Sequence, residues 1–210
     1  MTRPLTARGE RTRAGLVVAA RTVFERDGFT DARLTDITAE AGCATGSFYT
    51  YFDSKEDILD AVLAAAQEEM LHPGLHHGET GRSEADPIAT IEAANRAYFE
   101  AYRRNARLMM VREQVVGVSP EFRAKRLQRG QVFVERNAKS IKELQDAGRA
   151  DPDLDPLHAA GALSGMVSRM AYQAFGVADT DDLETLVFTA TRLWVNALGL
   201  RGGIRPEREQ

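Results

Sequence analysis

Residues 34–56 constrain the fold of this chain most strongly, because they carry the pattern of two short helices joined by a tight turn. Leu34, Ile37 and Ala41 are spaced three and four residues apart, so they lie on one face of the first helix. Gly42 follows where a helix can end, since a residue without Cβ adopts the left-handed conformation at little cost. A second helix starts at once after it, and the segment therefore predicts a helix-turn-helix.

The second helix of this pair has an apolar side and a polar side. Phe48 and Phe52, four residues apart, form the apolar side. The remaining surface carries hydroxyl groups and aromatic edges, which come from Thr45, Ser47, Tyr49, Thr50 and Tyr51. The second helix of a helix-turn-helix lies in the DNA major groove, where such side chains meet base edges, thymine methyl groups and phosphates. The pattern therefore predicts binding to double-stranded DNA.

The spaced positions of this segment resemble the amino-terminal domain of the TetR (tetracycline repressor) family of transcriptional regulators. The residues that carry the resemblance are Gly28, Phe29, Ala39, Gly42, Gly46, Phe48, Tyr49, Tyr51, Phe52, Ser54, Lys55, Glu56, Ile58 and Leu59, preceded by Leu16, Ala19, Ala20, Val23 and Phe24. The resemblance covers roughly the first quarter of the chain. It implies a helix-turn-helix DNA-binding domain over residues 1–53 and a helical effector-binding and dimerisation domain over residues 54–210. It also implies a repressor that binds a palindromic operator as a dimer and is released by a small effector.

The resemblance assigns DNA contacts to individual positions. Those that face bases or phosphates in the family are held here by Thr45, Ser47, Tyr49 and Thr50. Tyr49 and Lys55 stand at typical phosphate-contacting positions, and Gly46 permits a close approach of the backbone. For Tyr51 a phosphate contact and a packing role are equally supported, whereas the two phenylalanines are expected in the core.

The chain departs from the family at the start of the first helix of the pair. The family commonly has two capping threonines there, and this chain has Ala32 and Arg33. The cap is therefore expected to shift to Thr30 or Asp31. Arg33 and Thr35 would then reach DNA directly, although a solvated turn accounts equally well for Arg33.

The formal net charge of −4 is unevenly distributed along the chain. Residues 1–55 contain eight Lys and Arg against seven Asp and Glu, and the rest contains 19 against 24. Six arginines fall within residues 1–26, against only Glu10 and Glu25. The positive charge therefore gathers at the start of the first helix, where it would meet a phosphate backbone. A solvated helix face is the alternative explanation.

The sequence also predicts a compartment. No apolar run approaches the roughly 20 residues of a membrane helix, and residues 1–8 lack the apolar centre of a secretion signal. We therefore expect a cytoplasmic protein with no membrane partner. The single cysteine, Cys43, fits a reducing compartment, and we expect it to pack as a small hydrophobe, with a redox-sensing role as the alternative.

Helix starts are clearly marked in this chain. Proline follows a capping residue at Asp86-Pro87, Ser119-Pro120 and Asp155-Pro156, and Ser54 caps a fourth helix. No segment shows sustained period-two alternation, so the fold is predicted to be all-α with about nine helices. Their expected bounds are 8–27, 35–42, 45–51, 54–71, 87–104, 106–116, 120–148, 156–175 and 181–199.

The last two of these helices indicate a homodimer. The final helix carries a broad apolar stripe that includes Leu186, Ala190, Leu193 and Ala197. The helix before it is apolar nearly all round, and its candidate interface residues are Ala160, Gly161, Ser164 and Val167. A helix without a polar face must be covered on both sides, and one chain offers too few other helices to do so. We therefore expect these helices to pair with those of a second copy across a two-fold axis, as they do in the resembling family.

The middle helices contain aromatic and sulfur-containing side chains with few polar groups, as the walls of an apolar ligand site do. The candidate effector-binding residues are Tyr98, Phe99, Tyr102, Met109, Met110, Arg112, Glu113, Phe133, Met166 and Met170. Taken singly, each is better explained as ordinary core, and the set gains weight because the resemblance implies a ligand pocket here. An apolar or amphipathic ligand would suit it, with Arg112 as the partner of an anionic group.

No cofactor, metal or enzymatic activity is expected. His72, His76 and His77 lie among proline and glycine without an acid or cysteine at ligand spacing, which favours a solvated loop. The chain has no nucleophile elbow, no paired acids at catalytic spacing and no phosphate-binding glycine loop. Two alternatives stay open: a regulator switched by a protein partner, and a carrier or enzyme that retains a vestigial helix-turn-helix.

Overall fold

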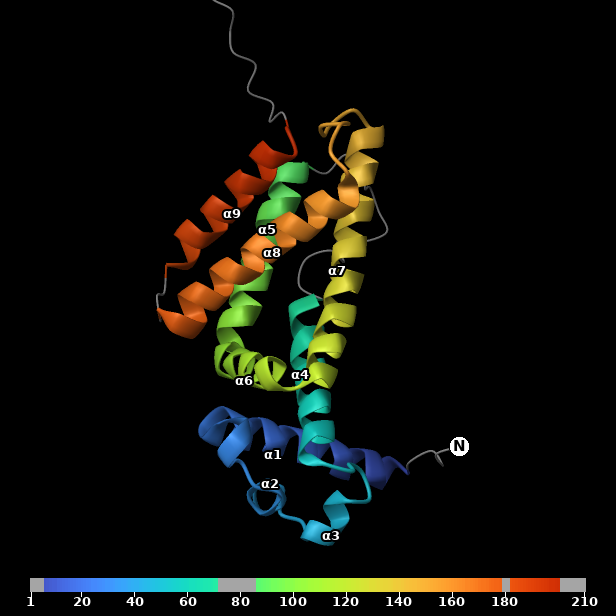
Figure 1. Ribbon diagram of the computed structural model, residues 1–210, viewed down its shortest axis with the longest axis vertical. Helices are drawn as coiled ribbons and strands as arrows, with labels where there is room; N and C mark the ends of the chain where they lie inside the picture. Colours follow the sequence, from blue (N-terminus) through green and yellow to red (C-terminus); the bar gives the residue numbers. More distant parts are fainter. Residues whose placement is uncertain (1–5, 72–85, 179–181, 201–210) are drawn as a thin grey trace, which may run out of the picture. The chain divides into compact units, whose positions relative to one another are not determined.

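The computed structural model describes residues 6–71, 86–178 and 182–200, and every regular element in these ranges is helical (Figure 1). The all-α prediction is confirmed. The elements are α1 (Ala7–Asp31), α2 (Leu34–Glu40), α3 (Thr45–Phe48), α4 (Lys55–Leu71), α5 (Pro87–Arg104), α6 (Ala106–Val118), α7 (Pro120–Asp146), α8 (Pro156–Ala171), the π-helix η1 (Tyr172–Val177) and α9 (Leu183–Ala197).

The chain forms two compact units, which are described separately. The first lies within Met1–Glu69 and Asn105–Ala124, and the second within Met70–Arg104 and Lys125–Gln210. The predicted functional boundary after residue 53 stays a prediction.

The helix caps predicted at Ser54, Asp86, Ser119 and Asp155 are confirmed. Each capping oxygen accepts a hydrogen bond from a backbone N–H two or three residues later: Ser54 from Asp57 (3.1 Å), Asp86 from Ile88 (3.0 Å), Ser119 from Phe122 (3.4 Å) and Asp155 from His158 (2.8 Å). These bonds satisfy amides that have no partner within the helix, so each cap fixes where its helix begins.

The first unit is built on α1, which packs against α2 and α6. The buried face of α1 carries Leu16, Ala19, Ala20, Val23 and Phe24. Gly28 has φ +74° and interrupts the helical path of α1 close to the predicted helix end at residue 27. Only glycine adopts this conformation without strain, so Gly28 determines where the chain bends toward the helix-turn-helix.

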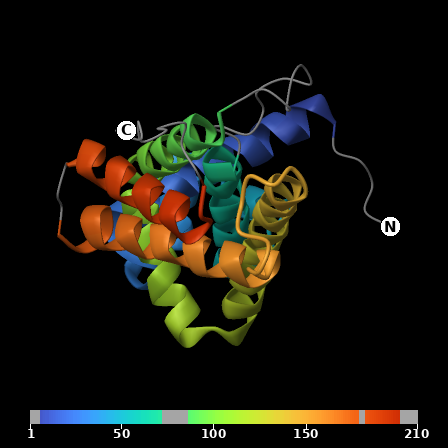
Figure 2. The same cartoon turned by 90° about the horizontal axis from the view of Figure 1, so that it is seen from above.

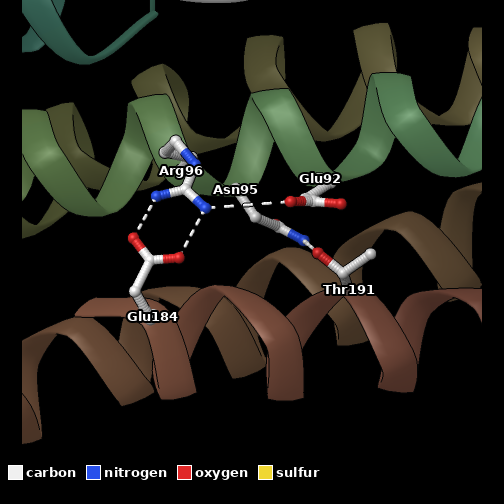
Figure 3. Close-up of polar contacts among 5 residues, drawn as sticks. All are labelled: Glu92, Asn95, Arg96, Glu184 and Thr191. Atoms are coloured by element: carbon white, nitrogen blue, oxygen red, sulfur yellow. Dashed lines mark hydrogen bonds and ion pairs between the residues drawn. The ribbon is translucent and has the colours of Figure 1, made fainter. Parts of the chain in front are cut away.

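In the second unit α5 lies beside α9, and α8 packs against both (Figures 1 and 2). A group of polar contacts joins α5 to α9 (Figure 3). The buried Asn95 Nδ2 donates a hydrogen bond to Thr191 Oγ1 at 3.1 Å. On the exposed side, Arg96 binds both carboxylate oxygens of Glu184, one of them at 2.8 Å. A buried hydrogen bond would be lost if one helix shifted along the other. The two contacts therefore fix the register of α5 against α9.

The Arg96–Glu184 pair makes stability depend on pH. The hydrogen bond from Arg96 lowers the pKa of the Glu184 carboxyl. Such an acid contributes stability above its unfolded pKa of about 4.3, and the contribution is lost as the pH falls through the folded pKa. We therefore expect Glu184→Gln to melt below the wild type at about pH 7 and the two melting temperatures to converge as the pH falls through the folded pKa of Glu184. The capping acids Asp155 and Asp182, whose pKa values are also lowered, are present in both proteins, so their effect cancels in the comparison. A difference in melting temperature that stays constant with pH would therefore contradict the prediction.

The helix predicted over residues 156–175 changes character at its end. The α-helical part stops at Ala171, and η1 continues it as a π-helix with a hydrogen bond from Ala178 N to Gln173 O at 2.9 Å. This wider helical turn directs the ring of Phe175 toward α5. The centroid of the ring lies 6.4 Å from the ring centroids of Phe99 and Tyr102.

Candidate nucleic-acid interface

The turn of the helix-turn-helix is closed by two backbone hydrogen bonds. Gly42 has φ +63° and donates to Ala39 O at 3.0 Å, and Cys43 donates to Thr38 O at 3.0 Å. This pair of bonds is the Schellman motif, which satisfies the last carbonyls of a helix and redirects the chain. The expected role of Gly42 is confirmed, and the turn holds α3 at a fixed angle to α2.

The predicted cap of α2 is wrong. Arg33 rather than Thr30 or Asp31 holds the N-cap position, in an extended conformation and without a side-chain cap hydrogen bond. The prediction failed because α1 continues to Asp31, so Thr30 and Asp31 belong to the end of that helix and cannot cap the next one. The side chains of Arg33 and Thr35 are exposed, and their contact with DNA stays a prediction.

The recognition helix α3 is shorter than predicted. It is α-helical from Thr45 to Phe48 rather than to residue 51. Beyond it, Thr50 N donates to Ser47 O at 3.3 Å and Tyr51 N donates to Phe48 O at 2.9 Å. Bonds that span three residues instead of four tighten the last turn of a helix. The recognition segment therefore ends in a 3₁₀-like turn instead of a further α-helical turn.

The two faces of this segment differ in burial as predicted. Phe48 and Phe52 are buried, with ring centroids 5.8 Å apart, so their expected core role is confirmed. Tyr49 is 57% exposed and packs edge-on against the ring of Phe48 at 5.4 Å. The other exposed residues of the candidate DNA face are Thr45, Gly46 and Thr50, while Ser47 and Tyr51 are half-buried. A rigid apolar support therefore carries an exposed polar surface.

Thr38 is a positioning residue that the sequence interpretation missed. It is 2% exposed, and its hydroxyl donates to Thr35 O at 3.1 Å and lies 3.3 Å from the Thr45 hydroxyl. Thr38 thus links α2 to the first residue of α3. The signal in the sequence was a hydroxyl residue next to Ile37 on the apolar face of α2, where a buried hydroxyl needs a partner.

Lys55 is engaged within the first unit. Its Nζ donates to the carbonyl oxygens of Phe29 (2.7 Å), Thr30 (3.3 Å) and Ala32 (2.9 Å) and lies 4.5 Å from the Phe29 ring centroid. These oxygens belong to the end of α1, where a cation stabilises the helix dipole. The predicted phosphate contact of Lys55 stays a prediction, and the ammonium already has a structural role.

A basic groove adjoins the turn. Arg8 and Arg11 of α1 line an open groove of about 480 Å³ together with Gly42 and Cys43. The guanidinium of Arg13 lies 4.9 Å from the Phe52 ring centroid. The concentration of arginine foreseen from the sequence therefore stands beside the helix-turn-helix, where positive charge attracts a phosphate backbone.

The candidate effector residues divide between the two units. Tyr98, Phe99, Tyr102 and Phe133 come together as a ring cluster in the second unit, joined by Phe175, which the prediction left out. Met166 and Met170 are half-buried on α8 of the same unit. The remaining four, Met109, Met110, Arg112 and Glu113, belong to α6 of the first unit. Their membership in one site stays a prediction.

The candidate dimer residues also differ in exposure. Ala160, Val167 and Ala190 are buried within one chain, whereas Leu193 is 42% exposed and Ala197 is exposed. Gly161, Ser164 and Leu186 are half-buried. Phe188 of α9 is 69% exposed and was missed, because it lies beside the apolar stripe. The exposed members are those that a second copy could cover, and their role stays a prediction.

Two further observations concern ions and membranes. The part of the chain that the structure describes contains no group of three His, Cys, Asp or Glu side chains placed to hold a metal ion. His72, His76 and His77 lie outside the described residues. Within the described ranges no helix has both the length and the apolar character needed to cross a bilayer.

These features define the class of the protein: a helix-turn-helix DNA-binding protein with a second, all-helical unit. Residues 16–62 match the family model described as "Bacterial regulatory proteins, tetR family", and residues 91–198 match "Transcriptional regulator EthR, C-terminal domain". The chain belongs to the TetR family of DNA-binding transcriptional regulators, whose members are regulators and not enzymes.

Relatives match over different lengths. The regulator SrpR from Pseudomonas putida is 39% identical over 70 residues, which is 33% of this chain and 33% of SrpR. The regulator EthR from Mycolicibacterium smegmatis is 23% identical over 201 residues, 90% of this chain and 87% of EthR. The structure of the regulator FadR from Bacillus subtilis in complex with stearoyl-CoA has the same fold, with a TM-score of 0.70 at 19% identity over 88% of this chain and 98% of that chain.

Proposed function

We propose that this chain is a repressor that binds a palindromic operator as a homodimer and releases it when a small effector binds the second unit. The observation that carries the proposal is the exposed side of the helix-turn-helix. Thr45, Tyr49 and Thr50 project from a segment whose two phenylalanines are buried. Hydroxyl groups on a rigid support suit contacts with base edges and phosphates, and the neighbouring arginines suit the backbone.

Exposed apolar side chains on α9 support the homodimer. In one chain the side chains of Phe188 and Leu193 are 69% and 42% exposed. Two large exposed apolar side chains on one helix favour burial by a partner. A two-fold dimer places its recognition helices about 34 Å apart, one turn of DNA. An operator with two inverted half-sites would match that spacing.

The proposed switch works through α4. This helix follows the helix-turn-helix directly in the chain, so a displacement of α4 changes the separation of the two recognition helices in the dimer. An effector needs only a preference of about 1–3 kcal/mol for one spacing to change operator occupancy. Long-chain acyl-CoA thioesters are suitable first probes, because FadR was solved with stearoyl-CoA and the ring cluster of the second unit is apolar.

Sequencing of genomic DNA captured by the full-length protein tests the proposal. We expect a small set of fragments that share an inverted repeat, and we expect an effector to lower the affinity measured by fluorescence anisotropy. The proposal fails if no fragment is preferred at moderate ionic strength, either with or without cell metabolites.

Substitutions in the first unit should separate charged from neutral contacts. Arg11→Ala is expected to weaken operator binding and to reduce the slope of log K against log salt concentration by about 0.9, the contribution of one phosphate contact. Tyr49→Phe removes only a neutral hydroxyl, so affinity should fall while the slope is unchanged. Lys139→Ala, an exposed cation on α7, serves as the control. An unchanged slope for Arg11→Ala would exclude the groove from the DNA-binding surface.

A further inference from the structure

We infer that Thr45 binds the amino group of a DNA base, which only adenine and cytosine present in the major groove, because Thr38 leaves the Thr45 hydroxyl able only to accept a hydrogen bond. The inference rests on the operator binding proposed above. It adds the kind of base that the recognition segment selects at one position, and it identifies Thr38 as the buried residue that sets this selection.

Three oxygen atoms form a chain of hydrogen bonds inside the helix-turn-helix. Thr38 Oγ1 lies 3.1 Å from the carbonyl oxygen of Thr35 and 3.3 Å from Thr45 Oγ1. Thr35 and Thr38 belong to α2, and Thr45 is the first residue of α3, which packs against α2. Because Thr38 is 2% exposed, water does not compete for its hydroxyl. The chain of bonds therefore connects a buried side chain of α2 to the exposed recognition segment.

The direction of these hydrogen bonds follows from the number of hydrogens available. A carbonyl oxygen can only accept, so the Thr38 hydroxyl donates its single hydrogen to Thr35 O. If this hydrogen pointed at Thr45 instead, two oxygen atoms 3.1 Å apart would face each other with no hydrogen between them. The bond between the two hydroxyl groups is therefore donated by Thr45. Successive bonds in such a chain polarise one another, which makes the Thr45 oxygen a better acceptor.

This direction restricts what Thr45 can bind on DNA. Thr45 is exposed, but its hydroxyl hydrogen is held by Thr38. Phosphate oxygens, guanine O6 and N7, and thymine O4 are acceptors, so they form no hydrogen bond with an oxygen that lacks a hydrogen. The amino groups of adenine and cytosine are the donors in the major groove. Each base pair carries one of them on one strand, so we expect adenine or cytosine at a defined strand position.

The neighbouring hydroxyl groups differ from that of Thr45. Tyr49 and Thr50 are also exposed, and within the described ranges neither side chain makes a hydrogen bond. Each therefore keeps its hydrogen for an acceptor such as a phosphate oxygen. The recognition segment thus combines an acceptor at Thr45 with donors at Tyr49 and Thr50.

Selection from a library of random DNA duplexes by the full-length protein tests the inference. The position bound by Thr45 is the one at which Thr45→Val loses the base preference of the wild type. We expect the wild type to favour adenine or cytosine there about fivefold over guanine or thymine, which corresponds to one neutral hydrogen bond. Thr38→Val frees the Thr45 hydrogen and should remove this preference.

Two further variants separate the hydroxyl from the packing of Thr38. Thr38→Ser keeps the hydroxyl and loses the methyl group, so it should retain the preference for adenine or cytosine. Thr22→Val is the matched control, because Thr22 is an exposed residue of α1 whose hydroxyl donates to Val18 O at 3.3 Å. It should leave the base preference unchanged.

A measurement on the wild type decides the question if the Thr38 variants do not fold. Unsubstituted purine in place of adenine, or 2-pyrimidinone in place of cytosine, removes the amino group alone from the selected position. We expect this exchange to weaken operator binding about fivefold in fluorescence anisotropy. Equal affinity for the two duplexes would overturn the inference.

The failure of the inference and the failure of operator binding give different results. Three results overturn the inference while operator binding stands: guanine or thymine at the Thr45 position, a Thr45→Val variant that changes no position, or a folded Thr38→Val variant that keeps the wild-type preference. If the wild type selects no common sequence from the library, the proposed operator binding fails and the inference fails with it.

Discussion

Replacing Phe48 by alanine is expected to lower the free energy of unfolding of the first unit by about 3–5 kcal/mol. Phe48 is fully buried, and its ring packs against Phe52 at 5.8 Å and Tyr49 at 5.4 Å, so the substitution leaves a cavity where α3 rests on the core. Urea unfolding followed by circular dichroism measures the loss. Operator affinity should fall with it, because the recognition segment loses its support.

Tyr49→Ala is the matched control for this prediction. It removes an aromatic ring from the adjacent residue, which is 57% exposed, so its effect on stability should stay near 1 kcal/mol or below. Its effect on DNA binding should nevertheless be large. If both substitutions reduce stability equally, the division of this segment into a core side and a reading side is wrong.

The second large effect concerns the dimer. Phe188→Glu is expected to convert the protein to monomers in sedimentation velocity, because it places a charge at an apolar side chain that the fold of one chain leaves 69% exposed. Operator affinity should drop on the order of a hundredfold, since the two recognition helices would no longer bind as a linked pair. Stability of the second unit should change little.

Two comparisons make this result decisive. Leu186→Glu should also give monomers, but with a loss of stability, because Leu186 is half-buried within the chain. Val132→Glu on α7 places the same charge at another exposed apolar side chain and should leave the dimer intact. A dimer that persists in both α9 variants would refute the proposed interface.

The sequence predicted those parts of the fold that local chemistry determines. The spacing of apolar residues and Gly42 were enough for the helix-turn-helix, and Asp-Pro and Ser-Pro pairs were enough for three helix starts, because caps depend on neighbours two or three residues away. The length of α3 was not predictable in this way. A turn with three-residue hydrogen bonds and one with four-residue hydrogen bonds are both compatible with apolar residues at Phe48 and Phe52. The apolar pattern therefore does not distinguish the two kinds of turn.

The sequence was a weaker guide where a role depends on tertiary contacts. The family pattern predicted a phosphate contact for Lys55, which stays a prediction, but it did not predict the three carbonyl oxygens from the end of α1 that surround the ammonium. Phe175 was missed as a member of the ring cluster because it stands in no motif. Its grouping with Phe99 and Tyr102 arises only when α5 and η1 pack together, which local patterns do not encode.

The π-helical turn at Tyr172–Val177 has a consequence for how relatives diverge. Each residue added to or removed from a helix rotates everything after it by about 100°. A homologue that is one residue shorter here would continue as a regular α-helix and would direct a different side chain, in place of Phe175, at α5. The insertion or deletion of a single codon in this stretch would therefore change the side chain that faces α5 without a substitution at any other position.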